Sequence, residues 1–113
     1  MTGPSKELQT MKAEFFRALA HPMRIRLLEV LSEKGEQSVQ ALHTRLDVAQ
    51  PIVSQHLAKL RAHGVVTIRK EGTSVFYALA DPRIGDLLRV AKEILNHRLT
   101  GSRTLLHELR RLG

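Results

Sequence analysis

Apolar residues recur every three or four positions over most of this chain, which is the spacing of one face of an α-helix. Residues 5–20 place four apolar side chains at this spacing: Leu8, Met11, Phe15 and Leu19. Ser5 is a suitable N-cap for the helix that this pattern predicts. The helix should end at His21, because a residue before proline avoids the helical region, and Pro22 suits the first turn of a second helix.

The same spacing predicts two shorter helices, over residues 22–34 and 38–46. The apolar face of the first is formed by Ile25, Leu28 and Leu31, and that of the second by Val39, Leu42 and Leu46. Gly35 suits the C-cap of the first helix, and Ser38 suits the N-cap of the second. Both helices should therefore begin and end close to these residues.

A further amphipathic helix is predicted over residues 50–63, with Val53, Leu57 and Leu60 on its apolar face. The opposite face carries small or uncharged side chains: Pro51, Ser54, Gln55, Ala58 and Ala62. Its basic residues lie at the margins of that face. Because this helix follows the helix over residues 38–46 after a connection of about four residues, the pair has the pattern of a helix-turn-helix unit.

Beyond Gly64 the apolar pattern changes from helical spacing to alternation. The segments VVTIRK and SVFYAL alternate with period two and flank Glu71-Gly72-Thr73. Gly72 can adopt the positive φ that a tight hairpin turn requires. We therefore predict a β-hairpin over residues 65–79 with Arg69 and Lys70 near its tip, which is the wing of a winged helix-turn-helix domain.

The last part of the chain returns to helical spacing, with Asp81 as N-cap and Pro82 in the first turn. Its apolar stripe is wide: Ile84, Leu87, Leu88, Ala91, Ile94 and Leu95. After Thr100-Gly101-Ser102 an amphipathic tail follows, with Leu105, Leu106, Leu109 and Leu112. A small domain has no inner surface for so much apolar area, so we expect a partner subunit to cover it.

Composition narrows the class of protein. The chain has 113 residues and a formal net charge of +7, which predicts one domain over residues 1–113 that binds a polyanion, nucleic acid first. Its zero cysteines exclude disulfides and thiol redox sensing. No apolar run approaches the roughly 20 residues of a membrane span and no signal peptide precedes the first helix, so we expect a cytoplasmic protein without membrane contact.

Three phrases in this order resemble the ArsR/SmtB family of bacterial winged-helix repressors: LAHPMRIRLLEVL at residues 19–31, PIVSQHLAKLRAHGVV at 51–66 and EGTSVFYAL at 71–79. The resemblance covers roughly residues 12–99. It implies a mainly α fold with a small β-hairpin, in the order α-α-α-α-β-β-α. It also implies a homodimer that binds an imperfect palindrome of double-stranded DNA and represses transcription until an effector relieves it.

The resemblance also assigns functional residues. The dimer interface is expected on the first and last helices, about residues 5–20 and 81–112, at Leu8, Met11, Phe15, Leu87, Leu88, Ala91, Ile94 and Leu95. The base-contacting residues are expected on the helix over residues 50–63: Gln50, Pro51, Ser54, Gln55 and His56. Phosphate contacts are expected from Lys59, Arg61, Arg69, Lys70, Thr73 and Ser74.

The family's metal sites match this chain poorly. Ser38 and Gln40 stand where many members have metal-binding cysteines, so a thiolate site of that kind is excluded. Of the Asp-x-His and His-x-x-Glu ligands that other members use, only Asp81 matches, and His97 stands in place of the glutamate. One hypothesis is a nickel or zinc site that joins Asp81, Glu93, His97 and His107 across a dimer. A small apolar ligand, a separate effector-binding protein and constitutive repression remain open alternatives.

The other two classes of function are an enzyme and a winged-helix module without sequence preference. The chain contains no glycine-rich phosphate loop, no HExxH or GxSxG motif and no paired carboxylates in an apolar setting, so we expect no enzymatic activity. The alternative is a winged-helix module that binds DNA without sequence preference or contacts another protein. Competition between promoter DNA and random DNA distinguishes these possibilities.

Overall fold

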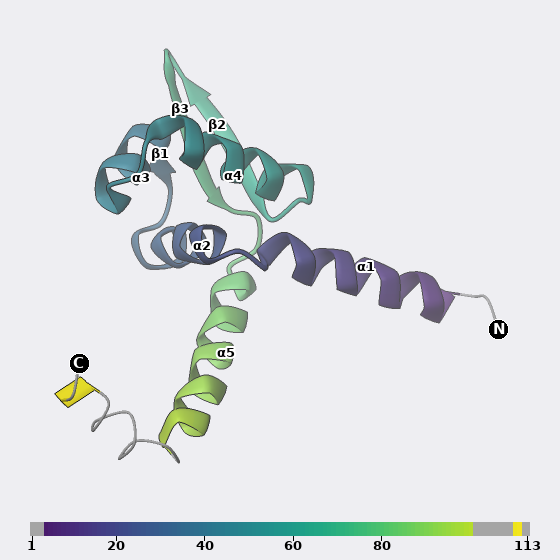
Figure 1. The fold of residues 1–113 in the computed structure, drawn as a ribbon. Helices are drawn as coiled ribbons and strands as arrows, with labels where there is room; N and C mark the ends of the chain where they lie inside the picture. The colour runs from purple at the N-terminus through teal and green to yellow at the C-terminus, as the bar shows by residue number, and fades with distance from the viewer. Residues whose placement is uncertain (1–3, 101–109, 112–113) are drawn as a thin grey trace.

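The computed structural model describes residues 4–100 and 110–111 and contains five helices and a small sheet within that part of the chain (Figure 1). The helices are α1 (Pro4–Leu19), α2 (Pro22–Lys34), α3 (Val39–Leu46), α4 (Gln50–Ala62) and α5 (Arg83–Thr100). The strands are β1 (Gln37–Ser38), β2 (Val66–Glu71) and β3 (Ser74–Leu79). The predicted winged helix-turn-helix fold is confirmed. The leucines predicted after Gly101 lie outside the described residues.

Side-chain caps explain where α2 and α3 begin. The His21 side chain caps α2, because its Nδ1 accepts a hydrogen bond from the Met23 N–H at 3.0 Å. Ser38 caps α3, because its Oγ accepts from the Ala41 N–H at 3.0 Å. The prediction that Ser5 caps α1 was wrong. The helix already includes Pro4, whose missing N–H and fixed φ suit a first turn.

The sheet has the order β1-β3-β2, with both pairs of strands antiparallel. The hairpin turn between β2 and β3 contains Gly72 at φ 61°, as the sequence predicts. Strand β1 was missed, because two residues are too short to show alternation. It pairs Gln37 with Tyr77 and Ser38 with Phe76, which anchors the hairpin to the segment between α2 and α3.

Helix α2 lies at the centre of the apolar core. It packs against α4, α5 and β3, so more than one of its sides is covered. Leu27 is therefore fully buried together with Leu28, whereas Ile25, expected on the inner face, is only half-buried. The rest of the core comes from the end of α1, where Ala18 and Leu19 are buried, and from α3, α4, the start of β2 and one turn of α5. No polar or charged side chain of the described residues is buried.

The two terminal helices leave apolar faces uncovered. In Figure 1, α1 and α5 extend from the body of the domain in different directions. Met11 and Ile94 are 65% and 57% exposed, Leu8, Ala91 and Leu95 are also exposed, and Phe15, Leu87 and Leu88 are half-buried. None of the helices within residues 4–100 is long and apolar enough to cross a membrane.

Gly85 allows α5 to pack closely on α2, and this contact provides a stability test. A Cβ at residue 85 would collide with Ser32 Oγ and lie 3.0 Å from Ser32 Cβ. Overpacking of this kind costs about 1–3 kcal/mol, which outweighs the gain of up to about 1 kcal/mol from replacing glycine by alanine in a helix. We expect Gly85→Ala to lower the free energy of unfolding by about 1–2 kcal/mol in urea titrations.

Ser32→Ala provides the matched control, because it removes the oxygen that collides with the new methyl group. The double variant should recover part of the lost stability. If Gly85→Ala lowers the free energy of unfolding by the same amount in the wild-type and Ser32→Ala backgrounds, this account of the contact is wrong.

Candidate nucleic-acid interface

Helix α4 has two faces of different chemistry. Val53, Leu57 and Leu60 are fully buried, as predicted, and they hold the helix against the core. On the other side, Gln50, Pro51 and Gln55 are exposed, and Ser54 is half-buried. Sequence reasoning overlooked one apolar residue outside the core, Ile52, which is 46% exposed. The helix therefore presents uncharged hydrogen-bonding side chains to solvent while its other face is held rigidly.

The turn before α4 sets the angle between the two helices of the unit. Asp47 adopts a left-handed conformation with φ 54°, which ends α3. The Val48 N–H then donates to the His43 carbonyl at 3.1 Å, and the Ala49 carbonyl accepts from the Ile52 and Val53 N–H groups. Aspartate tolerates this conformation better than most residues, so this position suits a tight connection.

The tip of the wing is polar and exposed. Lys70, Thr73 and Ser74 are all exposed, and they lie around the turn at Gly72. Lys70 faces Val75 across the hairpin, and Glu71 faces Ser74. The structure thus places these three predicted phosphate contacts together at the end of the hairpin. Lys59 and Arg61 are exposed on the later turns of α4.

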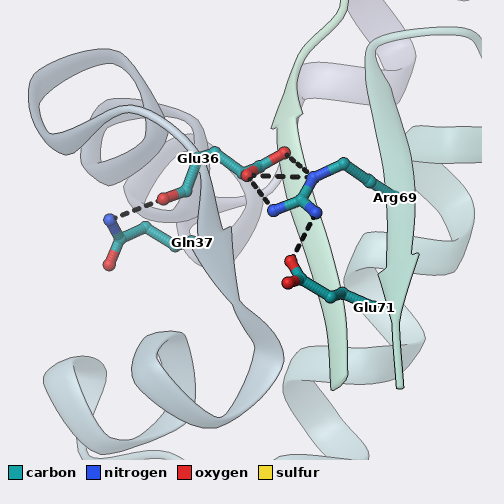
Figure 2. Close-up of polar contacts among 4 residues, drawn as sticks. All are labelled: Glu36, Gln37, Arg69 and Glu71. Atoms are coloured by element: carbon teal, nitrogen blue, oxygen red, sulfur yellow. Dashed lines mark hydrogen bonds and ion pairs between the residues drawn. The ribbon is translucent and has the colours of Figure 1, made fainter. Parts of the chain in front are cut away.

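Arg69 lies on the wing but is bound by two carboxylates (Figure 2). Its Nη2 lies 2.7 Å from Glu36 Oε1 and its Nη1 lies 2.7 Å from Glu71 Oε2. Its Nε also donates to Glu36, and its guanidinium carbon lies 4.7 Å from the centre of the Phe76 ring. The hydrogen bond from Arg69 lowers the pKa of Glu36, and the two carboxylates raise the pKa of Arg69.

This arrangement joins the wing to the loop after α2, because Glu36 precedes β1. We call Glu36, Arg69 and Glu71 the wing clamp. The positive charge of Arg69 is offset within the clamp, whereas Lys70 forms no ion pair among the described residues. Sequence reasoning missed Glu36, because it lies 33 residues from its partner and belongs to no motif.

His56, predicted as a base contact, packs toward the junction of α1 and α2. Its Nδ1 accepts a hydrogen bond from Arg24 Nε at 3.3 Å, and its ring centre lies 4.3 Å from that of His21. Arg24 Nη1 also donates to the Ala18 carbonyl at 3.0 Å, so this arginine connects three helices. Burial lowers the pKa of His56, and the nearby His21, Arg24 and Lys59 lower it further.

The candidate metal ligands do not converge within one chain. Asp81 accepts from the Arg83 N–H and forms an ion pair with the Arg83 side chain at 2.7 Å, which lowers its pKa to about 2. Glu93 pairs with Arg89 at 2.8 Å. No group of three His, Asp or Glu side chains in residues 4–100 and 110–111 could hold a metal ion. His107 lies outside the described residues.

Comparison with known proteins places this geometry in context. The family model described as a helix-turn-helix domain matches residues 19–69. The uncharacterized HTH-type transcriptional regulator Rv0081 of Mycobacterium tuberculosis is 39% identical over 109 residues, covering 96% of each chain. The HTH-type transcriptional repressor SmtB of the same organism is 41% identical over 85 residues, covering 75% of this chain and 62% of the repressor.

Solved structures agree with the fold. The crystal structure of Rv0081 superposes with a TM-score of 0.76 at 40% identity, covering 89% of this chain and 98% of the other. The homodimeric winged helix-turn-helix DNA-binding domain Mb0332 from Mycobacterium bovis, a possible ArsR-family transcriptional regulator, superposes with a TM-score of 0.78 at 26% identity, covering 88% and 91%. Rv0081 and SmtB are named as transcriptional regulators and Mb0332 as a possible one, and none of the three is named as an enzyme.

The environment of His56 predicts a pH-dependent stability. Because its pKa in the folded chain is lower than its ordinary value of 6.5, the unfolded chain binds more protons as the pH falls below that value. Stability should therefore decrease as the pH falls from about 6.5 toward the folded-state pKa and level off below it. Asp81 titrates in a separate window at lower pH, between 3.8 and about 2.

Urea titrations between pH 7.5 and 5 should detect this effect, since His56→Gln should remove its contribution to the slope. His43→Gln, on α3 away from this junction, is the control for replacing a histidine by glutamine elsewhere in the chain. An identical pH slope in wild type and His56→Gln would contradict the assignment.

Proposed function

Because the chain belongs to the ArsR/SmtB family of winged helix-turn-helix transcriptional regulators, we propose that it is a homodimeric repressor that binds an imperfect DNA palindrome. Helix α4 would enter the major groove, and the β2–β3 hairpin would contact the adjacent backbone as a wing. The observation that carries this proposal is the two-faced structure of α4. Its buried leucine and valine face fixes the helix, and the exposed face of its first two turns is uncharged and able to form hydrogen bonds.

The exposed face of α4 suits contact with base edges. The Gln55 amide can both donate and accept, which matches the major-groove edge of adenine, and the Ser54 hydroxyl can act in either role. Gln50 and Pro51 lie one turn earlier, at the start of the helix. Ala58 and Ala62 keep the following turns thin enough for close approach to the DNA. Base contacts would thus come from the first two turns of the helix.

Dimerisation would place two α4 helices on one DNA duplex. The uncovered apolar residues of α1 and α5 provide a surface that a second copy can bury. The relative Mb0332 is described as homodimeric, which supports this arrangement. Two chains would carry twice +7, or +14, formal charges, which favours association with DNA.

Effector control would act through the same helices. Asp81 and Glu93 are already paired with arginines, so a metal site on α5 would require His97 together with ligands from the second copy. A separate effector-binding protein, a small apolar ligand and constitutive repression are the other modes that fit a regulator with no thiol groups. Calorimetric titration with nickel and zinc separates metal control from the other modes. Only a metal site on α5 gives saturable metal binding that His97→Ala abolishes.

A base-contact variant tests the proposed recognition helix. Gln55→Ala should cost about 1–3 kcal/mol of binding free energy at one base pair, because a bidentate contact is lost. The measurement is fluorescence anisotropy with the DNA upstream of the gene, with single-base variants of that site, and with random DNA. Gln9→Ala on α1 is the control, since this exposed glutamine lies far from the proposed interface.

Wild-type protein should prefer its own site over random DNA by at least about a thousandfold at physiological salt. A preference near unity would favour the architectural alternative and refute specific repression. Loss of affinity for all sequences alike in Gln55→Ala would remove this residue from base recognition.

The wing clamp predicts different behaviour for two adjacent basic residues. Lys70→Gln should weaken binding to all sequences and reduce the slope of log affinity against log salt by about 1, because one phosphate contact is lost. Arg69→Gln should leave that slope unchanged, since its charge is offset by Glu36 and Glu71. Arg69→Gln should lower the affinity for DNA only because the wing is no longer held in position by the clamp.

A double-mutant cycle with Glu36→Gln provides the control. If Arg69 acts through Glu36, the double variant should bind DNA no more weakly than either single variant. A drop of about 1 in the salt slope of Arg69→Gln would instead make Arg69 a direct phosphate contact.

A further inference from the structure

A basic groove lies where α1, α2 and α4 meet, beside the later turns of the proposed base-contacting helix and apart from the wing. Its volume is about 310 Å³, and it is lined by Glu14, Arg17, Ala18, Ala20, Arg24, Lys59 and His63. Three of these residues are permanent cations and one is an acid. Arg17, Arg24 and Lys59 form no ion pair with any residue of the part of the chain that the structure describes. The groove thus has an excess of uncompensated positive charge.

The position of Arg24 in this groove is fixed by its neighbours. Its Nη1 donates to the Ala18 carbonyl and its Nε donates to His56 Nδ1, so two of its five N–H groups are used. The remaining three, including both on Nη2, have no partner among the described residues. A guanidinium held in this way is ready to bind phosphate oxygens without further loss of side-chain freedom.

The end of α1 could oppose an anion, because the last carbonyl groups of a helix carry partial negative charge. Here those carbonyls already accept hydrogen bonds. The Arg17 carbonyl accepts from the Ala20 N–H at 3.2 Å, and the Leu19 carbonyl accepts from the His21 N–H at 2.8 Å. The Ala18 carbonyl accepts from Arg24. The side-chain cations therefore dominate the charge of the groove.

Helix α4 links the groove to the DNA-binding surface. Lys59 follows Gln55 by four residues and precedes His63 by four, so these three side chains lie along one side of the helix. The His63 ring is anchored by its Nδ1, which donates to the Lys59 carbonyl at 2.9 Å. When a helix occupies the major groove, the phosphates of the backbone pass along its sides. One of those phosphates would reach the groove directly.

We propose that the α1–α2–α4 groove binds a phosphate of the DNA backbone through Arg17, Arg24 and Lys59. The junction of the first two helices is then a third DNA contact, in addition to α4 and the wing. This inference rests on the proposed function, since it requires α4 to lie in the major groove. In Figure 1, α1 ends beside the later turns of α4 and α3 lies beside its start, so the groove extends the contact surface past the end of the helix-turn-helix unit.

The test is the salt dependence of DNA binding by the full-length protein. Lys59→Gln alone tests the phosphate contact already expected of Lys59, and adding Arg17→Gln should reduce the slope of log affinity against log salt further, by about 1, for specific and random DNA alike. Both residues are exposed, so the variant should fold, and circular dichroism verifies this. Arg26→Gln is the matched control, because Arg26 is exposed on α2 but does not line the groove. Arg17→Lys combined with Lys59→Arg should retain the wild-type slope.

Two results would overturn the inference. If Lys59→Gln and the Arg17→Gln, Lys59→Gln variant have the same slope, while Gln55→Ala still reduces specific binding, the groove is refuted and the proposed function stands. The second result combines two measurements. If calorimetry shows saturable binding of inorganic phosphate to the DNA-free wild-type protein but not to the double variant, and adding Arg17→Gln does not change the DNA slope, the groove binds a free anion and not DNA. A wild-type preference for its own site near unity would instead count against the proposed function itself.

Discussion

The close packing of α2 against three other elements is the constraint on which the rest of the structure depends. Leu27, Leu28 and Leu31 are buried on this helix, and α4, α5 and β3 all contact it. The helix-turn-helix unit, the wing and the terminal helix are therefore positioned by one shared apolar surface. Since no polar side chain of the described residues is buried, this surface imposes shape through packing alone.

Polar contacts act on top of this packing, at the edges where elements meet. Arg24 joins α2 to the end of α1 and to α4, and the wing clamp joins the hairpin to the loop after α2. The clamp is exposed, so its value lies more in orientation than in stability. In both cases an arginine provides several donors in a fixed geometry, which one lysine could not replace.

The order of helices and strands could be predicted from the sequence because it follows from local signals. The boundaries of α2 follow from Pro22 and Gly35, and the hairpin follows from alternation around Gly72. The two faces of α4 could also be predicted, since periodicity alone separates them. Features that depend on distant partners could not be predicted. Glu36 and Arg69, or His21 and His56, become neighbours only after folding.

The separation of the two faces of α4 also affects how such a protein can change over generations. Gln55 is exposed and takes no part in the core, so most substitutions there should alter stability by less than about 0.5 kcal/mol. With Gln55 as the proposed base contact, mutations there would change the preferred DNA sequence without first passing through unstable variants. A gene duplicate of this regulator could acquire a new operator through a few substitutions on this face, while the leucine core stays as it is.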